Sequence, residues 1–367
     1  MLSSTLFSEM KRVLASILSL VVAAVLCEFF IVSQFKIPVF APHIFSQEVG
    51  WESRPNATGW NLESGELVAK GPLGWNDNNV SEAIKPKCAI NFYGDSFLEA
   101  AQFSADRNFA SLLEVSLNKS TDCKNFLVNN FGLSGTGTLQ QSRILLKQGA
   151  VYPAEHSALF VFLGNDLSNN LFTSSNGIAP GFVGFPDKFE IREATYTRSQ
   201  LRESIRNFVA PLTDHSDLLR LLANSLLNRS QQQSGTQVPY DAQSDRLRGI
   251  QINPKQKEWR LEVLRLSLIK NVVNAQRNNT KLTVFLLPTA KEIAFGDTSE
   301  VKKIKTNIFE WCRELNIICK DIYPELRRHN GVSGNSRFHL SLGGHFNLRG
   351  HSAVARILNQ YYSKELK

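Results

Sequence analysis

The sequence predicts a three-layer α/β fold, with helices on both faces of a parallel sheet, preceded by an N-terminal transmembrane helix. Two patterns lead to this prediction. Short apolar runs alternate with helical patterns from Cys88 onward, as in chains of βαβ units. An apolar stretch with almost no charge lies near the N-terminus. The 367 residues show no internal repeat, so we expect one domain that carries an insertion.

The alternating elements can be placed along the chain. We expect strands at 88–94, 125–132, 158–166, 281–290 and 316–322, and helices at 108–118, 139–149, 256–276, 301–315 and 349–364. Residues 170–255 interrupt this alternation with aromatic loops, a helix expected at 216–228 and a low-complexity stretch at 229–245. Because this insertion follows the third strand, we expect it to form one wall of the ligand cleft.

The N-terminal apolar stretch runs from Val13 to Val32, and its only charge is Glu28. A helix of this length rises roughly 30 Å, enough for the hydrocarbon core of a bilayer. The preceding Lys11 and Arg12 favour a cytoplasmic N-terminus. A cleaved signal peptide is the alternative, although no small-x-small cleavage site is present. The predicted division is a cytoplasmic tail at 1–12, a transmembrane anchor at 13–33, an irregular lead-in at 34–85, and an extracytoplasmic domain at 86–367 in the periplasm or outside the cell.

The composition and motifs argue against nucleic-acid and metal partners. The formal charge of +8 comes from 41 basic and 33 acidic residues that are interleaved along the chain, without a basic run that includes aromatics. Nucleic-acid binding is therefore not expected. Neither Cys-x-x-Cys nor His-Glu-x-x-His occurs, so we predict no metal site and no cofactor.

Four of the five cysteines lie beyond the predicted anchor, which contains Cys27. Cys88 and Cys123 each precede an expected strand, and Cys312 and Cys319 flank a short segment. An even number of cysteines in an oxidising compartment favours the disulfides Cys88–Cys123 and Cys312–Cys319. Four free, buried thiols are the alternative.

Small polar residues follow the expected strands, where parallel sheets bind their ligands. They are Ser96 after the first strand, Gly135 in a glycine-rich turn after the second and Asn165 after the third, and His345 precedes the last helix. Acyl transfer needs such a set, because a hydroxyl nucleophile requires a base and the oxyanion requires N–H donors. Each residue also has a simpler interpretation: a helix cap for Ser96, a turn or phosphate cradle for the glycines, an Asx-turn for Asn165 and a surface position for His345.

Four blocks of sequence carry a resemblance to a known family. The stretches "GDSF", "GLSGTGT", "LGND" and "GGHFNLRGH" resemble, in this order, the conserved blocks of the SGNH, or GDSL-type, hydrolase superfamily. The resemblance spans about residues 85 to 362 and implies a flavodoxin-like arrangement of the sheet. It also implies that Ser96 is the nucleophile, that His345 is the general base, and that Ser96 N–H, Gly135 N–H and the Asn165 amide form the oxyanion hole.

The lead-in and the closing block resemble those of envelope-attached members of this superfamily, which act on acylated glycans. The resemblance therefore implies a membrane-anchored serine esterase that removes acyl groups, expected to be acetyl, from an extracytoplasmic carbohydrate or another small ester. The alternatives are an O-acyltransferase that modifies a cell-envelope polysaccharide and a catalytically inert glycan-binding or assembly subunit.

One departure from the family pattern concerns the residue that orients the histidine. Many members have an aspartate two or three residues before it, where this chain has Leu342 and Gly343, and Gly344 follows. Two interpretations stay open: a backbone carbonyl holds the His345 ring, which gives a Ser-His dyad, or the site has lost activity.

Overall fold

The protein is described here by a computed structural model, and the described residues are 2–30, 34–39, 42–77, 88–120, 123, 125–171, 179–185, 188–194, 200–227, 254–331, 336–341 and 344–366. The low-complexity stretch expected at 229–245 and the end of the expected anchor at 31–33 lie outside them.

A five-stranded parallel sheet forms the centre of the fold, as predicted. It consists of β5 (Ala89–Gly94), β6 (Leu127–Gly132), β7 (His156–Phe162), β10 (Lys281–Leu287) and β11 (Ile318–Asp321). The spatial order is β11-β10-β7-β5-β6, and every neighbouring pair is parallel. Counted along the chain this is the order 2-1-3-4-5 of flavodoxin-like sheets, whose ligands bind beside the first and third strands.

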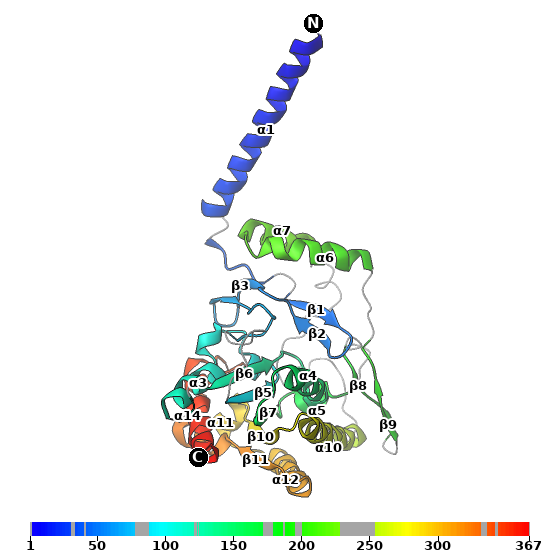
Figure 1. Cartoon of the computed structure of the whole chain (residues 1–367), viewed down its shortest axis with the longest axis vertical. Coiled ribbons are helices and arrows are strands. Elements are labelled where there is room, and N and C mark those ends of the chain that lie inside the picture. Colours follow the sequence, from blue (N-terminus) through cyan, green and yellow to red (C-terminus); the bar gives the residue numbers. More distant parts are fainter. Residues whose placement is uncertain are drawn as a thin grey trace.

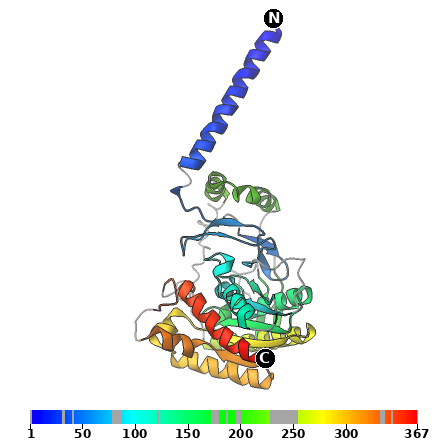
Figure 2. The ribbon, with the colours of Figure 1, turned by 60° about the vertical axis from the view of Figure 1, so that its left-hand side comes forward.

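Helices cover both faces of this sheet, which confirms the predicted three layers (Figure 1). One face is covered by α3 (Phe109–Ser120), α13 (Tyr323–Asn330) and α14 (Leu348–Glu365), and the other by α4 (Thr138–Val151), α10 (Pro254–Arg277) and α12 (Ser299–Glu314). Figure 2 shows α14, in red, lying along its face of the domain.

Successive side chains of each strand point to opposite faces of the sheet, which produces a layer of core on each face. Phe92, Phe160 and Phe285 belong to the core cluster under α3 and α14, and the Phe160 and Phe285 rings stack at 5.4 Å. Their neighbours Tyr93 and Val284 belong to the cluster under α4 and α10. A strand that is buried on both faces reads as a continuous apolar run, which is the pattern seen in the sequence.

The lead-in, expected to be irregular, contains two antiparallel hairpins. They are formed by β1 (His43–Ser46) with β2 (Gly50–Ser53), and by β3 (Thr58–Trp60) with β4 (Leu67–Ala69). The buried amide of Asn76 donates to the carbonyls of Glu99, Ala100 and Phe103. The lead-in is therefore packed onto the sheet domain at the strand end where Ser96 lies.

The insertion contains a hairpin of β8 (Gly181–Phe185) and β9 (Lys188–Arg192), followed by helices α6 (Gln200–Thr213) and α7 (Asp217–Leu227). We expected this region to form a wall of the cleft. In both views α6 and α7 lie instead beside the end of α1 (Leu2–Phe30), on the far side of the lead-in hairpins from the sheet (Figures 1 and 2). The ion pair between Arg54 and Asp214 joins them to the lead-in.

Helix α1 contains a span of 24 residues, Phe7–Phe30, that is long and apolar enough to cross a membrane, and none of it is buried within the protein. A signal sequence near the N-terminus has the same length and composition, so the alternative in the sequence analysis still stands.

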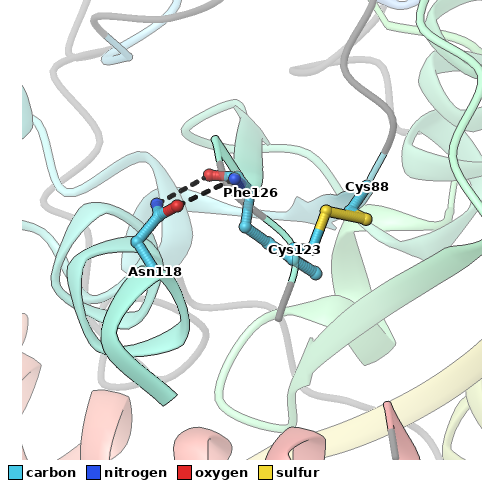
Figure 3. The surroundings of a disulfide bond; sticks show 4 residues. All are labelled: Cys88, Asn118, Cys123 and Phe126. Carbon is cyan, nitrogen blue, oxygen red and sulfur yellow. Dashed lines mark hydrogen bonds between the residues drawn. A yellow bond between two sulfur atoms is a disulfide. The ribbon is translucent and has the colours of Figure 1, made fainter. Parts of the chain in front are cut away.

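The structure contains the disulfides Cys88–Cys123 and Cys312–Cys319, and Cys27 is a free thiol. Cys88 and Cys123 precede the neighbouring strands β5 and β6 (Figure 3). Beside this bridge the amide of Asn118 binds both the N–H and the carbonyl of Phe126, at 2.8 and 2.9 Å. The bridge and this side chain together fix the start of β6.

We predict that alkylation of the denatured protein without reductant modifies Cys27 alone, whereas alkylation after reduction modifies all five cysteines. Mass spectrometry after proteolysis gives the count. Equal labelling of Cys88 or Cys312 with and without reductant would show that these bridges do not form.

Candidate active site

Ser96 lies at the carboxyl end of β5, where the chain turns into the short helix α2 (Ser96–Glu99). The helix cap is Asp95, whose carboxylate accepts the Phe97 N–H at 2.9 Å. Ser96 is thus the first helical residue, and its hydroxyl lies 2.9 Å from Nε2 of His345. The simpler interpretation of Ser96 as a helix cap is therefore excluded.

His345 lies in the loop that precedes α14, and several contacts fix this loop. Asn347 caps α14 by accepting the Gly350 N–H at 3.0 Å, and its amide donates to the Arg337 and His339 carbonyls. The ring of Phe97 lies 5.2 Å from the His345 ring. The imidazole is thereby held beside the residue that follows Ser96.

The other ring nitrogen of His345 contacts Glu63, a residue that sequence reasoning missed. Oε2 of Glu63 lies 2.7 Å from Nδ1, and Oε1 accepts the backbone N–H of His345 at 2.9 Å. The dyad held by a backbone carbonyl is therefore not what the structure shows, because a carboxylate from the lead-in lies against the ring. No local pattern reveals this residue, since 282 positions separate it from His345.

Gly344 explains how Glu63 reaches the histidine. A Cβ at this position would lie 2.6 Å from Oε1 of Glu63 and 2.6 Å from Oγ of Ser341, so a side chain here would displace the Glu63 carboxylate. The glycine directly before His345 thus leaves the space that the Glu63 carboxylate fills. Residues 342 and 343, where the family aspartate would lie, are outside the described residues.

The Glu63 carboxylate is ionised at neutral pH. Partial burial raises its pKa, but hydrogen bonds and the charge interaction with His345 outweigh this and lower it overall. An ionised carboxylate at Nδ1 favours the tautomer that carries its proton there, which leaves the lone pair of Nε2 facing the Ser96 hydroxyl. This is the proton arrangement that a general base requires.

The glycine-rich turn after β6 is held by a buried carboxylate. Glu99 accepts both the N–H and the hydroxyl of Ser134, and Lys70 and Ser53 of the lead-in bind the same carboxylate. Burial would raise the pKa of Glu99, but the Lys70 charge and these hydrogen bonds lower it to about 2. The next residue, Gly135, has φ of +80°, which a glycine adopts without strain.

The three expected oxyanion donors come from the ends of three strands. Among the described residues, the N–H groups of Ser96 and Gly135 have no protein acceptor. Asn165 is the first residue of the turn into α5 (Asp166–Asn169), beyond β7. Its amide is close enough to Asp95 to lower the pKa of that carboxyl slightly. Ser96 and Asn165 therefore follow β5 and β7. These are the neighbouring strands at which the order of the strands along the chain reverses direction across the sheet.

Beneath the site lie two buried carboxyl groups, Asp95 and Asp166. Burial raises the pKa of Asp95 to about 6, against smaller opposing contributions from its hydrogen bonds. Burial and the nearby Asp95 charge raise the pKa of Asp166 well above its ordinary value.

Two further histidines near the site are buried in the core. Burial lowers the pKa of both His339 and His351 to about 3, so both stay neutral. His345, with its side chain 12% exposed, is the histidine that contacts the Ser96 hydroxyl. Over the described part of the chain, no three His, Cys, Asp or Glu side chains are grouped to bind a metal ion.

Comparison with known proteins gives similarity only at the level of structure. No protein-family model matches the sequence, and no curated protein matches it. Among solved structures, it is similar to a lipolytic protein of the G-D-S-L family from Veillonella parvula (12% identity, TM-score 0.41, covering 75% of this chain and 98% of that one). It is also similar to a GDSL-like lipase from Parabacteroides merdae, with 11% identity and a TM-score of 0.44 over 78% of this chain and 100% of that one. A further similar structure is the lipase/acylhydrolase from Enterococcus faecalis, with 11% identity and a TM-score of 0.40 over 76% of this chain and 96% of that one.

We predict that Glu99→Gln destabilises the protein by roughly 3 kcal/mol or more at pH 7, because it leaves Lys70 buried and unpaired. The pKa of Glu99 is lower in the folded than in the unfolded protein. Its ionised carboxylate therefore stabilises the fold fully above about pH 4.5, and this stabilisation is lost as the pH falls toward 2. Urea unfolding at pH 7, 5, 4 and 3 should therefore show the difference from wild type shrinking with acidity.

Glu66→Gln is the matched control, since its ion pair with Arg107 is more exposed. It should change the free energy of unfolding by less than about 1 kcal/mol. A Glu99→Gln effect as small as that of Glu66→Gln at pH 7 would contradict this role for Glu99.

Proposed function

We propose that this chain is a membrane-anchored serine esterase that removes acyl groups, acetyl in particular, from an extracytoplasmic glycan. One observation carries the proposal: Ser96 Oγ, the His345 ring and the Glu63 carboxylate form a continuous line of contacts of 2.9 and 2.7 Å. This is the nucleophile, base and orienting acid of acyl transfer, recognised by geometry and not by their order in the sequence.

In the first step the Ser96 oxygen attacks the carbonyl carbon of the ester, and its proton passes to Nε2 of His345. The carbonyl oxygen gains a negative charge, for which the Ser96 N–H, the Gly135 N–H and the Asn165 amide are the proposed donors. Collapse of this intermediate breaks the ester bond, and the leaving alcohol takes the proton from Nε2. The acyl group then remains on Ser96 as an ester.

In the second step a water molecule gives a proton to Nε2 as its oxygen attacks the acyl carbon. Nε2 then returns this proton to the Ser96 oxygen as the acyl–oxygen bond breaks, which releases the acid and restores the serine hydroxyl. Throughout both steps Glu63 acts as a positioning residue. Its carboxylate holds the Nδ1–H tautomer and stabilises the imidazolium that forms each time Nε2 takes a proton.

The proposed substrate class and location follow from several features together. Ser96 is only 2% exposed, which favours a small acyl group over a long chain. The apolar helix α1 supports an anchor, and the two disulfides support an oxidising compartment. The resemblance of the lead-in to that of envelope proteins supports an acylated carbohydrate as the substrate.

Two alternatives use the same fold. An O-acyltransferase for a cell-envelope polysaccharide would form the same acyl-enzyme and pass the acyl group to a sugar hydroxyl instead of water. The other alternative, an inert glycan-binding or assembly subunit, is suggested by the missing aspartate. The contact between Glu63 and His345 supplies a carboxylate in its place, so it removes the reason for this alternative.

We predict that a fluorophosphonate probe labels the wild-type protein and not Ser96→Ala, and that this variant hydrolyses a chromogenic acetyl ester at least about 10³-fold more slowly. Ser352→Ala, a change of an exposed serine on α14, serves as the control and should label normally. Equal labelling of Ser96→Ala and wild type would remove Ser96 from the mechanism. Acetate release that occurs only with a glycan acceptor would identify the transferase.

We predict that Glu63→Gln lowers kcat by about 10²- to 10⁴-fold with little change in KM or in thermal stability, because Glu63 acts through its contact with His345. Glu63→Asp should recover part of the activity, which a purely structural role would not require. Gly344→Ala should cause a similar loss by displacing the carboxylate.

Because both changes break one contact, the double variant Glu63→Gln/Gly344→Ala should be little slower than either single variant. Independent, multiplicative losses would mean that Gly344 and Glu63 do not act through the same contact.

A further inference from the structure

Helices α6 and α7 expose an apolar surface that a soluble domain would bury. In α6 it comprises Ile205, Phe208 and Leu212, and in α7 Leu219, Leu222 and Leu226. Both sets have the spacing i, i+3, i+7, which places each on one face of its helix. Phe208 is 76% exposed and Leu226 is 71% exposed. We call these six residues the apolar stripe.

The opposite faces of the two helices are polar or small and are turned toward the protein. Ala210, Thr213, Arg220 and Ala223 are buried. Asp214 forms two hydrogen bonds with Arg54 of the lead-in, at 2.5 and 2.8 Å. Amphipathic helices of soluble domains bury the apolar face and expose the polar face, so this pair is inverted.

The location of the stripe indicates what covers it. Helices α6 and α7 lie beside the end of α1 in both views, with α7 the nearer of the two (Figures 1 and 2). Glu28 of α1 accepts hydrogen bonds from the Ser216 hydroxyl and from the N–H groups of Asp217 and Leu218, at 2.6 to 2.9 Å. The last turn of the apolar span thus caps the first turn of α7.

This cap also explains Glu28, which is the one charged residue between Val13 and Phe30. A carboxylate inside a bilayer is costly, but at the end of the span it lies near the interface. There it satisfies N–H groups at a helix start that otherwise lack partners. The contact places the start of α7 beside the last turn of α1.

We propose that α6 and α7 form an interfacial hairpin, with the apolar stripe inserted into the outer leaflet of the membrane that α1 crosses. The occupant of the stripe is lipid, because α7 begins against the end of the apolar helix α1 and the polar side of the helix pair is already bound to the lead-in. The inference rests on the membrane anchoring in the proposed function and is independent of the esterase chemistry. The hairpin fixes the orientation of the lead-in, and thereby the height of the catalytic cleft above the bilayer.

The test uses the full-length chain in nanodiscs, with or without lipids brominated on their acyl chains, which quench nearby tryptophan. Phe208→Trp reports on the stripe. Phe295→Trp is the matched control, since Phe295 is 66% exposed but lies in α11 (Ala290–Phe295) of the sheet domain. Leu20→Trp reports on the insertion of α1. Wild-type emission from the five native tryptophans is subtracted in each lipid.

The proposal predicts that Phe208→Trp and Leu20→Trp both lose emission in brominated lipid and that Phe295→Trp does not. Loss at Leu20 without loss at Phe208 would overturn it, and would mean that a second copy or another protein covers the stripe. No loss at either position would overturn the anchor together with the hairpin. Fluorophosphonate labelling of Ser96 in the same sample reports separately on the esterase.

Discussion

The contact between Glu63 and His345 is the constraint on which the arrangement of this site depends. It joins the lead-in to the loop before α14, and His345 in turn reaches the serine at the end of β5. A parallel sheet of this order brings the ends of β5, β6 and β7 to one edge, but it does not supply an acid for the histidine. That acid comes from outside the sheet, through space that Gly344 leaves open.

The lead-in therefore has three roles in this protein. It places Glu63 against the histidine, and through Lys70 and the buried Glu99 it holds the turn that carries Gly135. Through Arg54 it also binds α6 and α7, which lie next to α1. A segment that connects the apolar helix to the sheet thus links the proposed membrane contact to the proposed catalytic groups, and it orients both.

Much of the fold could be predicted because its signals are local. Each buried strand appears as an apolar run, and each strand end is marked by small polar residues such as Ser96 and Asn165. Glu63 could not be found in this way, since its role depends on a contact across 282 residues and its neighbours resemble an ordinary turn. The position of α7 could not be predicted either, because the amphipathic pattern does not say whether protein or lipid covers the apolar face.

The central claim is tested most directly by the protonation of His345. Nitrogen NMR of the protein labelled with ¹⁵N-histidine distinguishes the two tautomers, and His345→Gln assigns the signal among the seven histidines. The account predicts, at a pH where the ring is neutral, a proton fixed on Nδ1 and a bare Nε2. It also predicts that Glu63→Gln abolishes this preference. A proton on Nε2 in the wild-type protein, or a mixture of tautomers unchanged by Glu63→Gln, would contradict it.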